Sequence, residues 1–172
     1  MPRGGNLPCV DPVALSIIIA KPREEVFSYL ADVANHPEFT DHYLVDWRLT
    51  REESYGRGAG ARFRLKAPLQ RFDWADFTII EAEAPHRLVL AGRAGKFNRI
   101  RTLTTYTLDP GAGGQTDLAF EVDTQPPLPT DRLMEAITRP WLRRKARRGL
   151  KRLRSILEEG LDRGERATIA AR

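Results

Sequence analysis

Hydrophobic positions along the chain change their spacing several times, and each change marks a predicted element. Residues 13–20 (VALSIIIA) form a continuous β-branched run, as expected of a well-covered strand. Residues 21–33 carry Pro22 and two glutamates in their first turn and apolar residues along one side, which predicts a helix. The residue before Pro37 resists helical geometry, so residues 34–43 are expected to form a short second helix or a tight loop.

Six further strands are predicted in the middle of the chain. Residues 61–67 (ARFRLKA) alternate apolar and basic side chains at a period of two. In residues 43–53 the same period places Val45, Trp47 and Leu49 on one face. Short turns rich in Gly or Pro separate these segments, as in an antiparallel meander. The predicted strands are residues 43–53, 61–67, 74–84, 87–93, 99–109 and 116–124.

The last segment, residues 130–162, has helical spacing. An apolar stripe steps by three or four positions along its second part, and a shorter stripe, rotated around the helix axis, lies in its first part. Pro140 lies between the two stripes, so a kink or a change of packing partner is expected there. The longer stripe consists of Leu142, Ala146, Leu150, Leu153, Leu157 and Leu161, and the shorter one of Leu133, Ile137 and Trp141.

This order of elements predicts an α+β fold. A strongly curved antiparallel sheet of about seven strands, wrapped around one long helix, would bury the apolar stripes. The surfaces of a curved sheet and a long helix cannot match along their whole length, so a pocket is expected between them. The 172 residues are expected to form a single domain (residues 13–162), with a flexible leader (residues 1–12) and a C-terminal tail (residues 163–172).

Positive charge is concentrated in one stretch. The formal net charge is +5, yet residues 139–154 (RPWLRRKARRGLKRLR) hold nine basic residues and no acid, which leaves −4 for the remainder. An amphipathic helix needs a polar face, so a solvated basic face is the first interpretation. Docking to an anionic membrane surface is the second, since each basic residue can contribute about 1 kcal/mol there. Nucleic acid is the third, but the run lacks interleaved aromatic residues for stacking on bases.

Few motifs point to a metal, a cofactor or a nucleophile. Cys9 is a single cysteine in the leader, with no neighbour that would activate its thiol. His36 and His42 flank a loop and are expected at the surface, and the histidines show no metal-ligand spacing. The sequence contains no nucleophile elbow and no phosphate-binding loop, so we expect no metal and no cofactor. Without a signal peptide or a membrane-spanning run, a soluble cytoplasmic protein is expected.

Four stretches carry a resemblance to a known superfamily: SIIIAKPREEVFSYLADVANHPEFTDH, TIIEAEAPHRLVL, TYTLDPGAGGQTDLAFEV and RRGLKRLRSILEE. They resemble the START-like or helix-grip superfamily (SRPBCC), in particular its polyketide cyclase/dehydrase and lipid-transport proteins. The resemblance extends over residues 13–160. It implies a helix-grip fold with one cavity that serves lipid carriage, hormone binding or ring cyclisation in different members. It implies no shared catalytic triad.

Acid–base chemistry in such a cavity depends on the register of residues 74–84. If this strand turns Ile80 inward, a period of two also turns Asp76 inward, where burial would raise the pKa of its carboxyl toward that of a useful base. The opposite register exposes Asp76 and buries Phe77 and Ile79. The sequence is equally consistent with both registers.

Residues 99–109 add further candidates. In the register that buries Tyr106, the strand turns Arg99 and Arg101 outward, whereas a buried arginine would indicate an acidic ligand. The candidate catalytic residues are Asp76 and Tyr106. The candidate ligand-binding residues are Trp47, Phe63, Trp74, Asp76, Thr102, Thr104, Tyr106, Phe120, Leu133, Ile137 and Trp141.

Three functional hypotheses follow from the sequence. The first is a carrier or binding protein for a lipid-like or polycyclic aromatic small molecule, held between sheet and helix. The second is an enzyme, a polyketide aromatase/cyclase or dehydratase that uses polar residues of the cavity. The third is an interaction protein that uses the basic helix on membranes or RNA. The sequence gives no oligomeric state.

Overall fold

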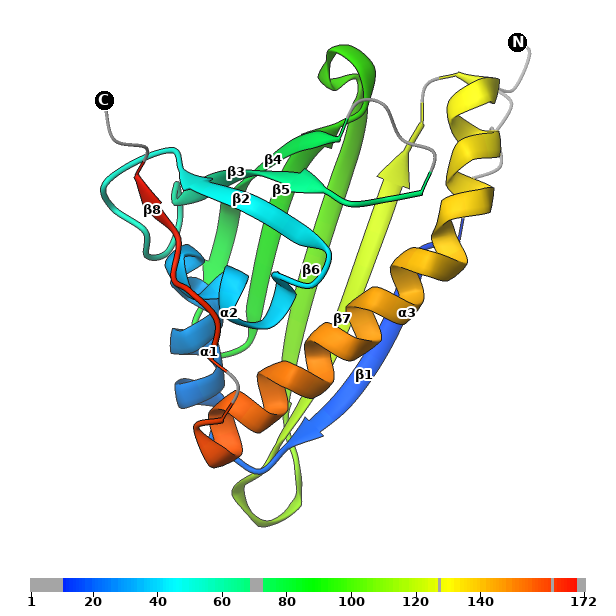
Figure 1. Cartoon of the computed structure of the whole chain (residues 1–172). Coiled ribbons are helices and arrows are strands. Elements are labelled where there is room, and N and C mark those ends of the chain that lie inside the picture. Colours follow the sequence, from blue (N-terminus) through cyan, green and yellow to red (C-terminus); the bar gives the residue numbers. More distant parts are fainter. Residues whose placement is uncertain (1–10, 69–72, 127, 162, 170–172) are drawn as a thin grey trace, which may run out of the picture.

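The computed structural model describes residues 11–68, 73–126, 128–161 and 163–169. Within these residues, eight strands form one curved, open sheet that wraps around a long C-terminal helix (Figure 1). This is the helix-grip α+β fold that the sequence predicts. The strands are β1 (Val13–Ile19), β2 (Leu44–Leu49), β3 (Gly60–Leu65), β4 (Trp74–Glu83), β5 (Arg87–Ala94), β6 (Ile100–Pro110), β7 (Thr116–Gln125) and β8 (Thr168–Ile169). The helices are α1 (Arg23–Ala31), α2 (His36–Thr40) and α3 (Pro129–Glu159), with 3-10 turns η1 (Val33–Asn35), η2 (Lys96–Asn98) and η3 (Ala112–Gly114).

The sheet is an antiparallel meander, and the first strand, β1, forms one of its edges beside β7. Its order is β1-β7-β6-β5-β4-β3-β2-β8, and every neighbouring pair is antiparallel except β2 and β8. Consecutive strands from β2 to β7 are therefore neighbours, as short turns require. The helices α1 and α2 follow β1 and lie beside the C-terminal half of α3, at one end of the sheet (Figure 1).

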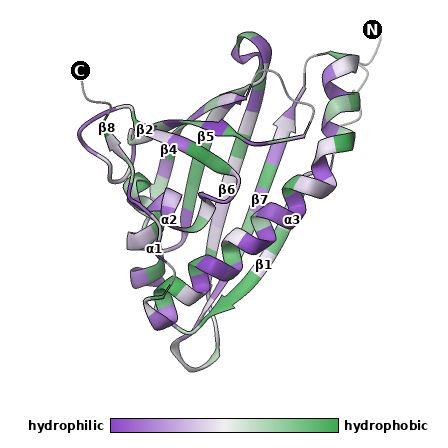
Figure 2. Cartoon of the chain, viewed as in Figure 1, coloured by the Kyte–Doolittle hydropathy of each residue, from purple (hydrophilic) through white to green (hydrophobic). Residues whose placement is uncertain are grey.

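The hydrophobic core lies at that same end. Side chains from the concave face of the sheet meet α1, α2 and the second half of α3 there. Figure 2 shows hydrophobic positions along β1 and β5 and, between polar positions, along α3. Helices α2 and α3 approach closely at Gly149, which has no side chain. A Cβ atom at this position would lie 3.3 Å from the carbonyl oxygen of Phe39. The largest fully buried side chains include Ile19, Leu30, Leu88, Leu108, Leu118, Leu153 and Ile156.

The helix α3 continues through Pro140, and its packing partner changes there as the sequence predicts. All the buried residues of α3 lie between Ala146 and Leu157, and none of residues 129–145 is buried. The helix also changes direction along its length (Figure 1). Proline has no N–H group for the helix ladder and its ring crowds the preceding turn, which explains a bend.

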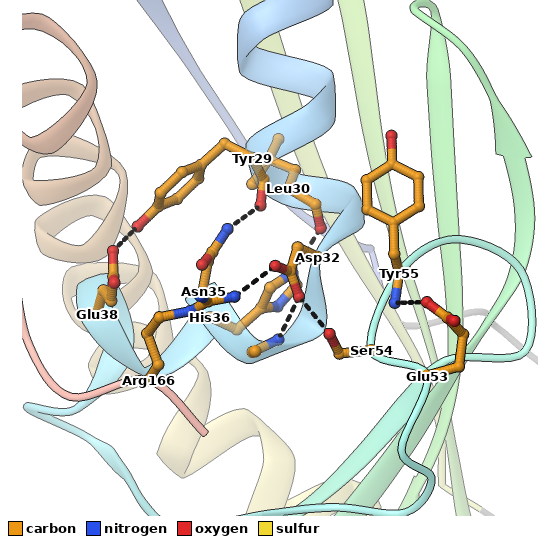
Figure 3. Close-up of polar contacts among 11 residues, drawn as sticks. Tyr29, Leu30, Asp32, Asn35, His36, Glu38, Glu53, Ser54, Tyr55 and Arg166 are labelled. Carbon is orange, nitrogen blue, oxygen red and sulfur yellow. Dashed lines mark hydrogen bonds and ion pairs between the residues drawn. The ribbon is translucent and has the colours of Figure 1, made fainter. Parts of the chain in front are cut away.

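The segment after α3 returns to the sheet. Arg166 pairs with Asp32 at 2.6 Å, and Asp32 also accepts a hydrogen bond from the Ser54 hydroxyl at 2.7 Å (Figure 3). The backbone N–H of Ala167 donates to the carbonyl oxygen of Ala34 at 2.9 Å, and β8 then pairs with β2. The predicted C-terminal tail thus contributes a strand. The predicted leader, with Cys9, lies almost wholly outside the described residues.

A bulge in β2 changes the predicted alternation of that strand. The backbone of Asp46 has φ = 55°, and the pairing with β3 shifts between Val45 and Arg48. An extra residue in one strand reverses the direction of the side chains before it. Trp47 and Leu49 face the core side as predicted, whereas Val45 lies opposite the exposed Arg64 and is not with them.

Candidate functional site

A cavity of about 450 Å³ lies between the concave face of the sheet and the first half of α3. Its volume falls in the range of about 300–1,000 Å³ that is typical of small-molecule sites. Its wall is mainly apolar and aromatic, with a few hydroxyl, carboxyl and imidazole groups. The sheet contributes Trp47, Phe63, Phe77, Leu90, Thr102, Thr104, Tyr106, Phe120 and Val122, and α3 contributes Met134, Glu135, Thr138, Arg139 and Leu142.

Strand β6 has the register that the sequence favours. Tyr106 and Leu108 are buried on its concave face, and Thr102 and Thr104 line the cavity from the same face. Arg101 is exposed on the opposite face. Of the other predicted residues, Trp47, Phe63 and Phe120 also line the cavity, and Trp47 stacks on Phe63 with ring centroids 4.7 Å apart.

Strand β4 has the register that turns Asp76 away from the cavity interior. Ile79 is buried and Phe77 packs against the core cluster, whereas Ile80 is 46% exposed. Asp76 borders the cavity, but alternation along β4 places it on the outer face of the strand. Trp74, predicted to bind the ligand, is on the same outer face and does not line the cavity. The guanidinium of Arg62 lies 4.7 Å from the centre of the Trp74 ring on that outer face. The buried carboxyl base that the other register would create is therefore absent at this position.

The first half of α3 is rotated relative to the prediction. Leu133 and Ile137 are 66% and 51% exposed and do not line the cavity. Trp141 is also outside the lining and packs edge-on against the ring of Tyr43, with centroids 6.1 Å apart. A largely polar side of the helix lies over the pocket instead. The α3 residues that line the cavity are Asp131, Met134, Glu135, Thr138, Arg139 and Leu142.

Arg99 lies at the cavity, contrary to the outward position predicted for it. It precedes β6, and its guanidinium forms two hydrogen bonds with the carboxylate of Asp131, at 2.6 and 3.0 Å. This bidentate pair joins the start of β6 to the first turn of α3. The hydrogen bond with Asp131 raises the pKa of Arg99. The arginine is therefore matched by a carboxylate of the protein itself.

Glu135 is a further carboxyl at the cavity, beside Asp76 and Asp131, and no pattern in the sequence singles it out. Burial raises the pKa of Glu135, while a nearby Arg139 and a hydrogen bond with Thr124 oppose that shift. Among the described residues, its Oε2 atom is sealed from solvent and has no hydrogen-bond partner. A protonated, neutral carboxyl avoids placing an unpaired negative charge at this buried oxygen.

His36 is the largest departure from the sequence prediction, because it is 2% exposed rather than at the surface. It begins α2, and its Nε2 atom lies 2.8 Å from the carbonyl oxygen of Leu30 (Figure 3). A carbonyl accepts only, so Nε2 carries the proton and Nδ1 keeps its lone pair. Burial lowers the pKa of His36 to about 4, so the imidazole is neutral near pH 7.

Aromatic rings surround this imidazole. Four of them have centroids between 5.5 and 6.5 Å from that of His36, and they belong to Phe39, Trp47, Phe77 and Tyr106. Burial raises the pKa of both Tyr43 and Tyr106, and the neighbouring Tyr43 raises that of Tyr106 further. Both phenols therefore stay protonated at neutral pH and remain donors.

The polar atoms of these three residues face the cavity. His36, Tyr43 and Tyr106 all line it, and neither phenolic oxygen nor the Nδ1 atom has a hydrogen-bond partner within the described parts of the chain. Among the described residues, the side-chain atoms that lack both a hydrogen-bond partner and contact with solvent are His42 Nδ1, Asp123 Oδ1 and Glu135 Oε2. The two phenolic oxygens and His36 Nδ1 are not in this set, so solvent in the cavity can reach them. They are thus open to the cavity at its inner, aromatic end.

No group of three or more His, Cys, Asp or Glu side chains within the described residues is placed to hold a metal ion. No helix in the described ranges combines the length and the apolar character needed to cross a membrane.

The sequence matches the family described as "Polyketide cyclase / dehydrase and lipid transport" over residues 12–158. The fold and its cavity are those of a helix-grip protein, and the chain belongs to this family. No curated protein sequence matches it.

Solved structures share the fold at low sequence identity. The solution structure of the KanY protein matches with a TM-score of 0.70 and 18% identity, over 88% of this chain and 99% of that one. TTHA0849 from Thermus thermophilus has a TM-score of 0.67 and 16% identity, over 87% and 99% of the two chains. Truncated norcoclaurine synthase from Thalictrum flavum has a TM-score of 0.67 and 10% identity, over 90% and 98%.

Proposed function

We propose that this protein binds a hydrophobic small molecule, lipid-like or polycyclic aromatic, in the cavity between the sheet and α3, as a carrier or binding protein. The observation that carries this proposal is the cavity of about 450 Å³ with its aromatic wall. Apolar surface that is removed from water contributes roughly 25 cal/mol per Å² to such binding. The family description, which includes lipid transport, supports the same class of ligand.

Two neighbouring positions on β6 test the proposal. Thr104 faces the cavity, and Leu103 is exposed on the other face of the strand. Thr104→Trp should fill the cavity and lower the affinity for a neutral hydrophobic dye such as Nile red by at least about tenfold, whereas Leu103→Trp should leave it unchanged. Equal affinities in the two variants would place the dye elsewhere. Native mass spectrometry of the purified protein, followed by organic extraction, then identifies any ligand that copurifies.

A second candidate function is an enzyme, a polyketide aromatase/cyclase or dehydratase. The observation that favours it is the phenol of Tyr106, which faces the cavity close to a neutral imidazole. The family description names cyclases and dehydrases, and norcoclaurine synthase, an enzyme by name, has the same fold. This hypothesis predicts that Tyr106→Phe lowers the turnover of a polyketide-like substrate more than its binding. An equal loss of both would favour the carrier.

A third candidate is docking on an anionic membrane through the basic side of α3. Arg143, Arg147, Lys151 and Arg154 line a groove beside the edge strand β1, and no ion pair of theirs occurs among the described residues. Lipid carriage requires contact with a membrane, and cations near anionic lipid supply it.

Vesicle binding tests this third candidate. Arg147→Gln with Lys151→Gln should weaken binding to phosphatidylserine-containing vesicles, and binding of the unmodified protein should fall steeply with salt. The matched control removes two charges from the outer face of the sheet, Arg93→Gln with Arg101→Gln. Similar losses in both double variants would show that net charge, not this groove, is responsible. Salt-sensitive binding to RNA but not to vesicles would favour the nucleic-acid alternative.

A further inference from the structure

We infer that the inner end of the cavity recognises a neutral hydroxyl group on an aromatic ligand. His36 Nδ1 accepts its hydrogen bond, and the phenols of Tyr43 and Tyr106 donate to the same oxygen or to a neighbouring one. The inference rests on the proposed binding function and names the chemistry of its ligand.

The acceptor is fixed by the fold. The carbonyl oxygen of Leu30 holds the Nε2–H group of His36 at 2.8 Å, which leaves Nδ1 with a lone pair and no proton. Nδ1 has no partner within the described residues, although the imidazole is almost completely enclosed. Nδ1 opens into a narrow, mainly aromatic cavity, where a hydrogen bond is electrostatically stronger than in bulk water, so a ligand group that donates to it gains affinity. Carboxylates, ethers and ketones cannot donate, whereas a hydroxyl can.

The donors complement this acceptor. The Tyr106 ring lies edge-on to the imidazole at 6.5 Å, and the Tyr43 phenol is close enough to Tyr106 to influence its ionisation. Neither phenol donates to a described protein atom, so both are available to an oxygen of the ligand. A hydroxyl oxygen can donate one hydrogen bond and accept others at once. One hydroxyl, or a hydroxyl beside a carbonyl, therefore satisfies both kinds of group.

The surroundings define the rest of the ligand. Of the rings around the imidazole, those of Trp47 and Phe77 line the cavity, and they favour a planar aromatic system next to the hydroxyl. The imidazole of His36 is neutral near pH 7, so it supplies no positive charge that would stabilise a phenolate. The class expected is therefore a neutral phenol or enol on a flat, apolar skeleton.

Two probes that differ in one group test this inference: 2-naphthol and 2-methylnaphthalene, titrated at pH 7. The informative quantity is the ratio of their dissociation constants, compared between proteins, because the difference in solvation between the probes then cancels. In the unmodified protein the ratio should favour 2-naphthol. His36→Phe should reduce that preference about tenfold and Tyr106→Phe about threefold, as expected for the loss of one buried hydrogen bond each.

A measurement without substitutions guards against misfolding of the His36 variant. In the unmodified protein labelled with ¹⁵N-histidine, the Nδ1 resonance of His36 should shift when 2-naphthol is added and stay in place with 2-methylnaphthalene. The inference is wrong if both probes bind, the ratio of their dissociation constants is the same in the unmodified protein and both variants, and the Nδ1 resonance does not shift with 2-naphthol. The proposed binding function would still stand in that case. If neither probe binds, the binding function fails as well.

Discussion

The two halves of α3 belong to one continuous helix, but they have different surroundings. From Ala146 to Leu157 the helix presents buried side chains to the core, packed against the sheet, α1 and α2. From residue 129 to 145 no side chain is buried, and the inner side of the helix covers a cavity. Stability should therefore reside mainly in the second half, and ligand binding in the first. The difference shows how one helix can be both core and cover.

The largest effect expected from this comparison is a loss of stability at the core half. Leu153→Ala removes a fully buried side chain and should lower the free energy of unfolding by about 3–5 kcal/mol. Leu133→Ala, the same change at an exposed position of the first half, should cost no more than about 0.5 kcal/mol. Urea unfolding monitored by circular dichroism measures both. Comparable losses in the two variants would remove the distinction between the halves.

The second effect concerns pH and the enclosed imidazole. Burial lowers the pKa of His36 from its usual 6.5 to about 4, so the unfolded chain binds a proton at a higher pH than the folded one. Stability therefore falls as the pH decreases from about 6.5 to 4, and His36 contributes about 3 kcal/mol to this loss. Urea unfolding at several pH values should show that His36→Gln, whose amide can still donate to Leu30, lacks this part of the decrease. An unchanged pH profile would contradict a buried neutral imidazole.

The third effect concerns how firmly the first half of α3 is held. The bidentate pair of Arg99 and Asp131 joins its first turn to the sheet. Asp131→Asn should accelerate amide hydrogen exchange in the first half of α3 and leave the second half unchanged. Asp41→Asn serves as the matched control, since Asp41 pairs with Arg152 in the second half. Uniform acceleration along α3 in the Asp131 variant would show that the two halves open together.

The sequence predicts most of the fold and part of the site, for identifiable reasons. In β3 and β7, one face of the strand is mainly apolar and the other mainly polar, so alternation defines the inner face. In β4 both faces carry apolar residues: Phe77 and Ile79 are on the inner face and Ile80 is on the outer face. A bulge after Ile79 then brings Ala82 back to the core side. The pairing of β4 with β3 and β5 determines which of its faces points inward. The sequence of β4 alone does not indicate this choice.

The missed site residues follow from the same limits. The buried environment of His36 comes from rings far away in the sequence, and a single histidine before a proline has no pattern that would reveal it. In the first half of α3, the apolar stripe of Leu133 and Ile137 indicates an inward face, but the cavity leaves that half without a core to cover. Apolar periodicity locates a core face only where the helix actually packs.

The smallest effect expected is also the sharpest test of this rotation. Leu133→Ser with Ile137→Ser changes only exposed side chains, so stability should change by no more than about 0.5 kcal/mol per substitution, and Nile red affinity should stay constant. Met134→Ser, on the neighbouring inward position, should weaken dye binding with a similarly small effect on stability. If instead the Leu133 and Ile137 variant loses the dye while Met134→Ser retains it, then the outer side of the helix belongs to the ligand site. The apolar stripe would then have indicated the binding face correctly, and α3 would have to turn when a ligand enters.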